Sequence, residues 1–392
     1  MKIKIKKLRF GNNKEPRKKN RAKKLRHILV AAAGLVLVLS AAYIAAKTVG
    51  NVAVSNITDA FRKTFMSSSN GGWPLTVDIL GIKEIKPVGG EILILSNDEA
   101  QLVTQHARTM GRIQFNASDS RTAVCNGRIL AYDTAKGNVV LLSKTEKLTE
   151  ISAGEKIYTA CLAQNGNFAV VTGGESDAQS KITVYSASGN AVFEWKCAGE
   201  RILDACFSMN GKRIAVVASG VNNAVVYSRL VVFDIDDTKP LSEIKYDDSM
   251  MLRVCVTKTG RTVVTGDNQF VIYNKKMQRV DGLEYSENQL NSVSFDEKGN
   301  TVLAMREFGG AQTRIFRYSA SGVKTAETTI SGEADYVRCD GTVTAVVCGK
   351  NATKLNKNGQ VTQTKTFDSV PEKVIYSSGS FFSLEENIIK KY

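Results

Sequence analysis

Histidine is scarce in this chain of 392 residues, which contains only His27 and His106. A histidine-based triad would have to rely on His106 alone, because His27 directly precedes a long apolar run. The patterns GxSxG, HExxH and GxxxxGKS are also missing. Their absence excludes the usual signatures of serine hydrolases, zinc proteases and P-loop NTPases. We therefore expect no catalytic residues and a protein that is not an enzyme.

Metal-binding and chain-breaking patterns are sparse as well. The seven cysteines form no CxxC or CxxCH spacing, so neither a metal nor a cofactor is predicted. Only five prolines occur, and the apolar runs they leave uninterrupted can form continuous sheets. Helical periodicity is missing after residue 66, which argues against βαβ enzymes. The main domain is predicted to be all-β.

The longest apolar run covers residues 28–46 and holds nineteen residues without a charge. A helix of that length spans about 28 Å, close to the roughly 30 Å of hydrocarbon in a bilayer. A cleaved signal peptide and a buried core helix are the alternatives. The first usually has a shorter apolar region, and the second would carry a polar face. We predict one transmembrane helix that is retained.

Residues 1–27 form a predicted basic cytoplasmic tail with thirteen Lys or Arg residues and one acid, Glu15. By the positive-inside rule, this tail keeps the N-terminus in the cytoplasm and places the rest of the chain outside the cell membrane. The same charges attract anionic membrane lipids. The residues predicted to orient the chain are Arg17, Lys18, Lys19, Arg21, Lys23, Lys24 and Arg26.

The net charge of +15 does not indicate a nucleic-acid partner. The tail supplies 13 of the 53 basic residues and 1 of the 38 acidic ones, so 40 basic and 37 acidic residues remain in 28–392. That nearly neutral remainder lacks the electrostatic footprint of a nucleic-acid binder. We therefore expect no nucleic-acid binding.

Residues 47–72 are predicted to form a juxtamembrane amphipathic helix and a flexible linker. Val54, Ile57, Phe61 and Phe65 recur at helical spacing, and the polar stretch SSSNGG follows at 67–72. The apolar stripe suits the membrane surface, the exterior domain or a second protein, and the residues do not decide among these.

The exterior domain, residues 73–392, repeats with a period of about forty residues. Eight turn glycines, each followed by an apolar strand-like run, are separated by 37 to 49 residues; they are Gly90, Gly127, Gly166, Gly211, Gly260, Gly299, Gly341 and Gly379. This period is typical of one four-stranded propeller blade. Seven or eight blades are possible, because Gly90 and Gly379 could share a composite blade, and eight are favoured.

The last repeat is incomplete and predicts circular closure of the ring. About two strands fit between Gly379 and Tyr392, whereas the segment LTVDIL at 75–80 precedes the first repeat without a blade of its own. If this N-terminal strand completes the C-terminal blade, no sheet edge is left open. The final dozen residues are then structural.

Several blades resemble known propeller families. The runs CFSMNGKRIAVVA at 206–218 and VSFDEKGNTVLAM at 293–305 are similar to the opening of WD-repeat and TolB-like blades. The runs at 129–143 and 182–196 resemble quinoprotein-like blades, although no Trp-Asp dipeptide closes any blade. The whole layout is similar to an uncharacterised family of membrane-anchored bacterial propellers, a domain of unknown function. This resemblance implies a fold and a location but no activity.

The cysteines share places in the repeat. Three of them lie five residues before a turn glycine, where Ser294 holds the equivalent place before Gly299, and two lie two residues before one; they are Cys161, Cys206 and Cys255, then Cys125 and Cys339. Equivalent positions in different blades are expected to lie too far apart for disulfides. We interpret these cysteines as small packing residues.

The leading functional hypothesis is a non-enzymatic binding or scaffold platform for an envelope protein, a peptide or a cell-wall glycan. Propellers bind through loops at the ring faces and through the central channel. Three loops, 173–181, 219–229 and 307–314, are predicted to be long and to emerge on one face. The candidate binding residues in them are Glu175, Asp177, Asn222, Asn223, Glu307 and Gln312.

Two alternatives belong to other classes. An extracytoplasmic carbohydrate-active hydrolase would use paired carboxylates in the propeller funnel. A cofactor or sensor protein of the quinoprotein type is weaker, because the metal-binding motifs are missing. Turnover of cell-wall fragments separates the hydrolase from the platform, and a coloured protein would favour the cofactor type.

Overall fold

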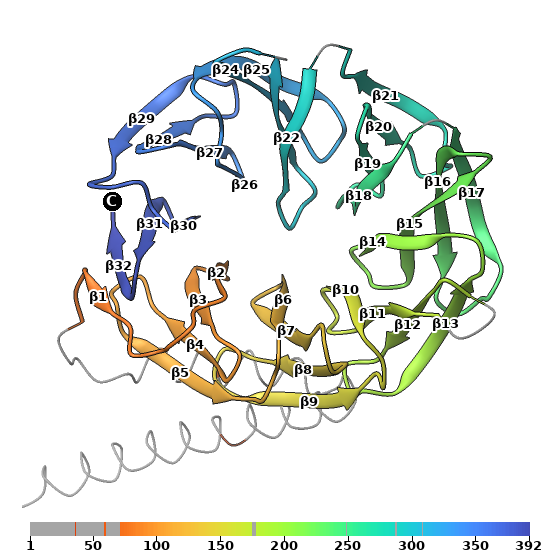
Figure 1. The fold of residues 1–392 in the computed structure, drawn as a ribbon, viewed down its shortest axis with the longest axis horizontal. Helices are drawn as coiled ribbons and strands as arrows, with labels where there is room; N and C mark the ends of the chain where they lie inside the picture. The colour runs from red at the N-terminus through yellow and green to blue at the C-terminus, as the bar shows by residue number, and fades with distance from the viewer. Residues whose placement is uncertain are drawn as a thin grey trace, which may run out of the picture. The chain divides into compact units, whose positions relative to one another are not determined.

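The computed structural model describes Val36, Asp59 and residues 71–392, except 175–177, 248, 287 and 308. The regular elements of residues 71–392 are strands, which form eight antiparallel sheets of four strands each. These sheets follow one another around a ring (Figure 1). The predicted all-β propeller is confirmed, with eight blades rather than seven.

Blades 1 to 4 follow the chain from the innermost strand to the outermost. Their strands are β2 (Glu84–Val88), β3 (Glu91–Leu95), β4 (Glu99–Val103) and β5 (Thr109–Gln114) in blade 1; β6 (Ser120–Cys125), β7 (Arg128–Asp133), β8 (Asn138–Leu142) and β9 (Lys147–Ser152) in blade 2; β10 (Ile157–Leu162), β11 (Phe168–Gly173), β12 (Ser180–Tyr185) and β13 (Ala191–Cys197) in blade 3; and β14 (Arg201–Phe207), β15 (Arg213–Asn222), β16 (Val225–Asp234) and β17 (Pro240–Asp247) in blade 4.

Blades 5 to 7 repeat this order, and blade 8 differs only in its outermost strand. Their strands are β18 (Met251–Val256), β19 (Thr262–Gly266), β20 (Gln269–Tyr273) and β21 (Arg279–Glu284) in blade 5; β22 (Asn288–Phe295), β23 (Thr301–Glu307), β24 (Gln312–Tyr318) and β25 (Lys324–Ser331) in blade 6; β26 (Tyr336–Asp340), β27 (Val343–Cys348), β28 (Asn351–Leu355) and β29 (Val361–Thr366) in blade 7; and β30 (Lys373–Ser377), β31 (Ser380–Glu385), β32 (Ile388–Lys391) and β1 (Leu75–Thr76) in blade 8.

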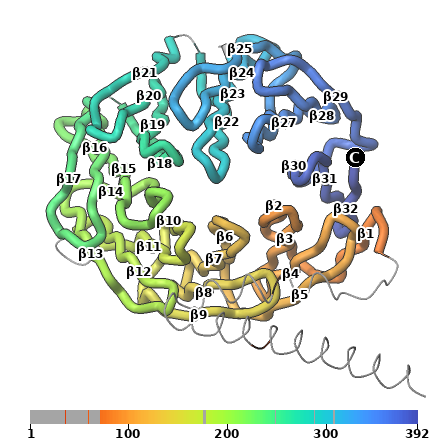
Figure 2. Tube along the Cα trace, turned by 180° about the vertical axis from the view of Figure 1, so that it is seen from behind, coloured from red at the N-terminus to blue at the C-terminus, as the bar shows by residue number. Residues whose placement is uncertain are grey.

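The ring closes through both ends of the domain, as predicted. Leu75 pairs with Ile389 and Thr76 with Ile388, so β1 is the fourth strand of the sheet that β30–β32 begin. Figure 2 shows β1 beside β32 from the reverse side. This pairing gives blade 8 its outermost strand and joins it to blade 1 through shared apolar packing.

Burial follows the position of a strand within its blade. The second strand of a blade is buried along nearly its whole length, as in β3 with the sequence EILIL, because neighbouring blades cover both of its faces. The outermost strand alternates between exposed and half-buried residues, as in β25 with the sequence KTAETTIS. The apolar runs that follow the repeat glycines therefore mark the second strands.

The hydrophobic core lies between blades. Each of the eight clusters of buried apolar side chains in the described chain joins two neighbouring blades. For example, the rings of Phe193 in blade 3 and Phe233 in blade 4 pack at a tilt of 54°, with centroids 5.2 Å apart. A single blade cannot bury its own faces, so the ring is stable only when it is closed.

The repeat glycines lie in the turns between the first and second strands. All eight have positive φ, between 57° and 90°, a conformation that glycine adopts without the steric cost of a Cβ atom. Because each blade is antiparallel, these turns and those between the third and fourth strands share one face of the ring. The connections between the second and third strands, and those between blades, lie on the opposite face.

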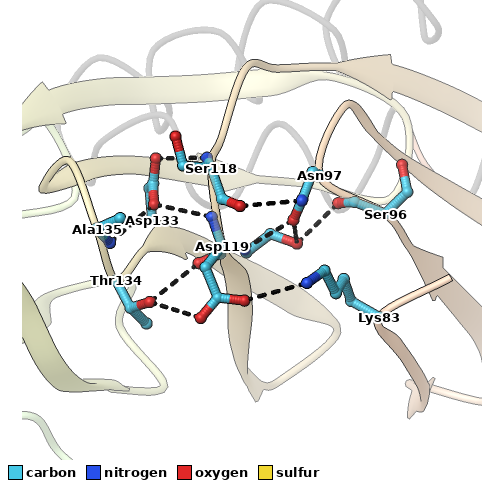
Figure 3. A network of polar contacts seen from close by, with 9 residues as sticks. Lys83, Ser96, Asn97, Ser118, Asp119, Asp133, Thr134 and Ala135 are labelled. Carbon is cyan, nitrogen blue, oxygen red and sulfur yellow. Dashed lines mark hydrogen bonds and ion pairs between the residues drawn. The ribbon is translucent and has the colours of Figure 1, made fainter. Parts of the chain in front are cut away.

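Polar contacts also join neighbouring blades (Figure 3). Between blades 1 and 2, the carboxylate of Asp133 accepts hydrogen bonds from the backbone N–H groups of Ser118, Asp119 and Ala135 at 2.7–3.1 Å. The side-chain amide of Asn97 reaches from blade 1 to the carbonyl of Ser118 at 3.0 Å. These bonds satisfy backbone groups where the chain passes from one blade to the next.

The predicted anchor lies outside the described residues, apart from Val36. Within the described part of the chain, no helix is long and apolar enough to cross a membrane. The tail 1–27 with its orienting residues also lies outside that part, and of 47–72 only Asp59, Gly71 and Gly72 are described. The chain divides into two compact units, residues 1–54 and 55–392.

Candidate functional site

A long β-hairpin distinguishes blade 4 from its neighbours. Strands β15 and β16 have ten residues each and pair without interruption from Arg213–Asp234 to Asn222–Val225. The turn consists of Asn223 and Ala224, both with positive φ, which is the geometry of a tight two-residue turn. The expectation of a loop at 219–229 is wrong, because the strands continue to within two residues of each other.

The tip of this hairpin exposes two aliphatic side chains. Val221 is 68% exposed and Val225 is 47% exposed. The tip lies on the face that carries the connections between second and third strands, which we call the hairpin face. Exposed aliphatic side chains at the end of a projecting hairpin are available to pack against a partner.

A pocket lies beside the hairpin on the same face. Its volume is about 530 Å³, and its wall combines the end of β13 and the connection into blade 4 with residues of β16 and β17. The residues that give it its chemistry are Trp195, Glu200, Tyr227, Arg229 and Lys245. These residues bring two aromatic rings, a carboxylate and two cations to one concave site.

Glu200 organises the floor of this pocket. Its carboxylate accepts hydrogen bonds from Arg229 Nη2 at 2.6 Å, from the Tyr227 hydroxyl at 2.9 Å and from the Cys197 thiol at 3.1 Å. The side chain of Glu200 is almost completely buried, so its charge needs these donors. Arg229 also pairs with Glu243 at 2.9 Å, which fixes the direction of its guanidinium.

Burial and hydrogen bonding oppose each other at Glu200. Burial alone would raise the pKa of this carboxyl, but hydrogen bonds from Arg229, Cys197 and Tyr227 outweigh it and lower the pKa below 4.5. Because the pKa is lower in the folded state, the ionised carboxylate stabilises the fold at pH values above the pKa of the unfolded state. That contribution is lost as the pH falls through the lowered pKa.

Replacing Glu200 with glutamine is expected to flatten the acid limb of the stability profile. Between about pH 5 and pH 3, the free energy of unfolding of the native protein should fall more steeply than that of Glu200→Gln. Urea unfolding at a series of pH values measures this difference. Glu150→Gln, on the exposed strand β9, is the control, and an equal flattening in both variants would contradict the assignment.

The opposite face carries the contact of Asp59 and is called the Asp59 face. The carboxylate of Asp59 accepts hydrogen bonds from Thr145 Oγ1 at 2.6 Å, from Ser143 Oγ at 3.2 Å and from the Lys144 N–H at 3.1 Å. These three residues form the turn between β8 and β9. The predicted apolar stripe of residues 47–72 lies outside the described residues, so this contact places Asp59 alone on the exterior domain.

The central channel is the third candidate region. All eight innermost strands line a cavity of about 760 Å³. Its carboxylates in the described chain are already engaged: Asp204 pairs with Arg253 at 3.0 Å, Glu297 accepts the N–H of Asn126 at 3.1 Å, and Asp296 caps its own turn. These partners favour structural roles for the channel acids.

The predicted binding residues do not form one site. Glu175 and Asp177 lie outside the described residues, and Asn222 and Asn223 lie at the hairpin tip. Glu307 ends β23 and Gln312 begins β24, two blades away. The three connections share the hairpin face, and of the four described residues only Asn222 lines the pocket beside blade 4.

The residues missed by sequence reasoning are those of the pocket floor. Arg229 carries a weak signal, because a charged residue in the apolar run VVYSRLVVFD suggests a partner within the fold. Glu200 and Cys197 carry none. Their meeting with Arg229 depends on the stacking of blade 3 against blade 4.

Solved structures with the same fold are similar to this chain at low identity. Sqt1 from Saccharomyces cerevisiae is 10% identical with a TM-score of 0.58, covering 83% of this chain and 99% of that one. BamB from Moraxella catarrhalis is 10% identical with a TM-score of 0.52, covering 81% and 99%. The Cps50 (Swd1) β-propeller domain of Myceliophteria thermophila is 9% identical with a TM-score of 0.50, covering 70% and 95%.

Identities this low show a shared fold and leave the activity open. The resemblance to WD-repeat and quinoprotein-like propellers is confirmed at that level. No curated protein matches the chain. One family model covers residues 76–391, which is nearly the whole ring. The chain therefore belongs to the family of unknown function DUF5711.

Proposed function

We propose that this chain is a single-pass, membrane-anchored extracytoplasmic propeller that acts as a non-enzymatic binding or scaffold platform. The observation that carries the proposal is the hairpin face of blade 4. There a projecting tip exposes Val221 and Val225 beside a pocket with a rigid Glu200–Arg229 pair. The pocket beside these valines holds Trp195, Tyr227 and Arg229, and Trp, Tyr and Arg are the residue types enriched in protein-binding hot spots.

The two faces of the ring carry different features. The contact of Asp59 with the turn between β8 and β9 lies on the Asp59 face. The hairpin tip and its pocket lie on the other face, away from this contact. In this arrangement the apolar run 28–46 anchors the protein, and the hairpin face meets the partner.

An envelope protein is the partner that this face favours. Aliphatic side chains such as Val221 and Val225 pack against apolar protein surface, whereas glycans are usually bound by aromatic platforms and hydrogen bonds. A peptide that inserts a polar group toward Arg229 would use the same pocket. A cell-wall glycan remains the third possible ligand, with Trp195 as its aromatic contact.

Crosslinking on intact cells tests the platform. The full-length protein is crosslinked, and captured proteins are identified by mass spectrometry for the native chain and for the double variant Val221→Asp, Val225→Asp. Two carboxylates in place of these exposed apolar side chains should reduce recovery of a reproducible partner about tenfold or more, because each would be buried without a partner in the interface. Val361→Asp, at a residue 60% exposed on β29, is the matched control.

Two outcomes would contradict the proposal. One is equal recovery of every captured protein with the double variant and with the control. The other is hydrolysis of purified cell-wall fragments by the protein, which would support the carbohydrate-active alternative with carboxylates in the channel.

A further inference from the structure

Four cysteines line one side of the central channel. Cys125 on β6, Cys161 on β10, Cys206 on β14 and Cys255 on β18 come from four consecutive blades, and all four contribute to the wall of the 760 Å³ cavity. All are free thiols, and three of them are half-buried rather than enclosed. This cavity falls in the range that admits a small molecule.

Two of these thiols contact each other across the boundary between blades 4 and 5. The backbone N–H of Val256 donates to the sulfur of Cys206 at 3.3 Å, which places that sulfur against the peptide bond after Cys255. The side chain of Cys206 also packs against the apolar cluster that contains Cys255. The expectation that equivalent cysteines lie too far apart is therefore wrong for this pair, because innermost strands of neighbouring blades converge at the channel.

The two thiols differ in chemistry. Contact with Cys255 and the hydrogen bond from the Val256 N–H lower the pKa of Cys206, and Arg253 acts in the same direction. The contact with Cys206 and burial raise the pKa of Cys255 well above 9. The thiolate form is the nucleophile in thiol–disulfide exchange. Cys206 is therefore the attacking sulfur, and Cys255 is the resolving one.

We propose that Cys206 and Cys255 form a reversible disulfide in the channel wall when a small-molecule disulfide enters the cavity. The Cys206 thiolate attacks one sulfur of the small disulfide, whose S–S bond breaks and releases a thiolate. Cys255 then loses its proton and attacks the Cys206 sulfur of the mixed disulfide, releasing the second thiolate. The protein pair is oxidised by two electrons and the small disulfide is reduced to two thiols.

The bond would join β14 of blade 4 to β18 of blade 5. The loop that it closes contains β15, β16 and β17, and therefore the hairpin at 213–234. A crosslink at the channel end restricts the movement of blade 4 against blade 5. The proposed disulfide needs no partner on the hairpin face, so its test is independent of the proposed binding platform.

The test uses the purified full-length protein and oxidised glutathione under non-denaturing conditions. The native chain should lose two free thiols and the mass of two hydrogen atoms, and its digest should contain a peptide pair linked through Cys206 and Cys255. In Cys255→Ser, the resolving thiol is missing, so a stable glutathione adduct should accumulate on Cys206. In Cys206→Ser, Cys255 should remain unmodified.

The structure supplies matched controls. Ser294 in blade 6 holds the place of Cys206, and its hydroxyl accepts the N–H of Cys339 at 3.0 Å, so Cys206→Ser keeps a proven acceptor and should fold. Cys348→Ser alters a half-buried thiol of blade 7 outside the channel and should leave the crosslink unchanged. Both thiols staying free, or Cys206 pairing with Cys161 instead, would overturn the proposal.

Discussion

Deleting residues 388–392 is expected to abolish cooperative folding of the propeller. The deletion removes β32, which pairs with β31 on one side and with β1 on the other. It also removes Ile389, which is completely buried between blades 8 and 1. Without this strand, the edges of β31 and β1 are left unpaired and the ring is open. Circular dichroism should show no cooperative melting transition, and gel filtration should show aggregates.

A point variant separates loss of closure from loss of chain length. Ile389→Asp keeps the chain intact but buries an unpaired carboxylate, so the free energy of unfolding should fall by about 4 kcal/mol or more. Val370→Asp, at a residue 63% exposed before β30, is the control and should change stability by less than about 0.5 kcal/mol. A truncated protein that melts like the native one would show that blade 8 does not need its third strand.

Replacing Asp59 with alanine is expected to lower the free energy of unfolding by about 2–4 kcal/mol. The carboxylate is buried and accepts three hydrogen bonds from the turn Ser143–Lys144–Thr145, and each bond to a charged group contributes about 1.5–3 kcal/mol before losses elsewhere. Burial lowers the pKa of the nearby Arg128, and Asp59 opposes that effect. Its removal therefore also withdraws a compensating charge from a buried guanidinium.

Hydrogen exchange locates this effect. In Asp59→Ala, the amide of Lys144 loses its acceptor and should exchange faster, while amides of blades 4 to 7 change little. Asp59→Asn keeps one acceptor oxygen without the charge and should fall between the two. Asp247→Ala removes an exposed carboxylate that pairs with Lys245 and is the control. Equal unfolding curves for the Asp59 and Asp247 variants would contradict a docked Asp59.

Much of the fold could be predicted from the repeat. The glycines that recur after about forty residues all adopt positive φ at the turn between first and second strands, and the apolar run after each is a buried second strand. Leu75 and the last strand could be matched because each end of the domain lacked a partner. Such features are local, since turn geometry and strand period depend on neighbouring residues.

The candidate site was less predictable because its residues come from different blades. The segment 219–229, expected to be a loop, is the end of a hairpin. The hairpin was hard to predict because its turn, Asn223–Ala224, lacks the glycine that is the usual sequence signal of a two-residue turn. Loop length groups Glu307 and Gln312 with Asn222. In the structure, Glu307 and Gln312 belong to blade 6, two blades away from Asn222 in blade 4. The length of a loop indicates where a chain tolerates variation, but it does not predict which residues are in contact in the folded protein.

The all-β class, the blade period and the closure of the ring follow from the amino-acid sequence, because their signals are short-range patterns of glycine and apolar residues. The contacts of Glu200 with Arg229, of Asp59 with the turn after β8, and of Cys206 with Cys255 come from the tertiary fold. These contacts join residues 29 to 85 positions apart or lie across a blade boundary. They arise from how tightly neighbouring blades converge, which no local pattern encodes.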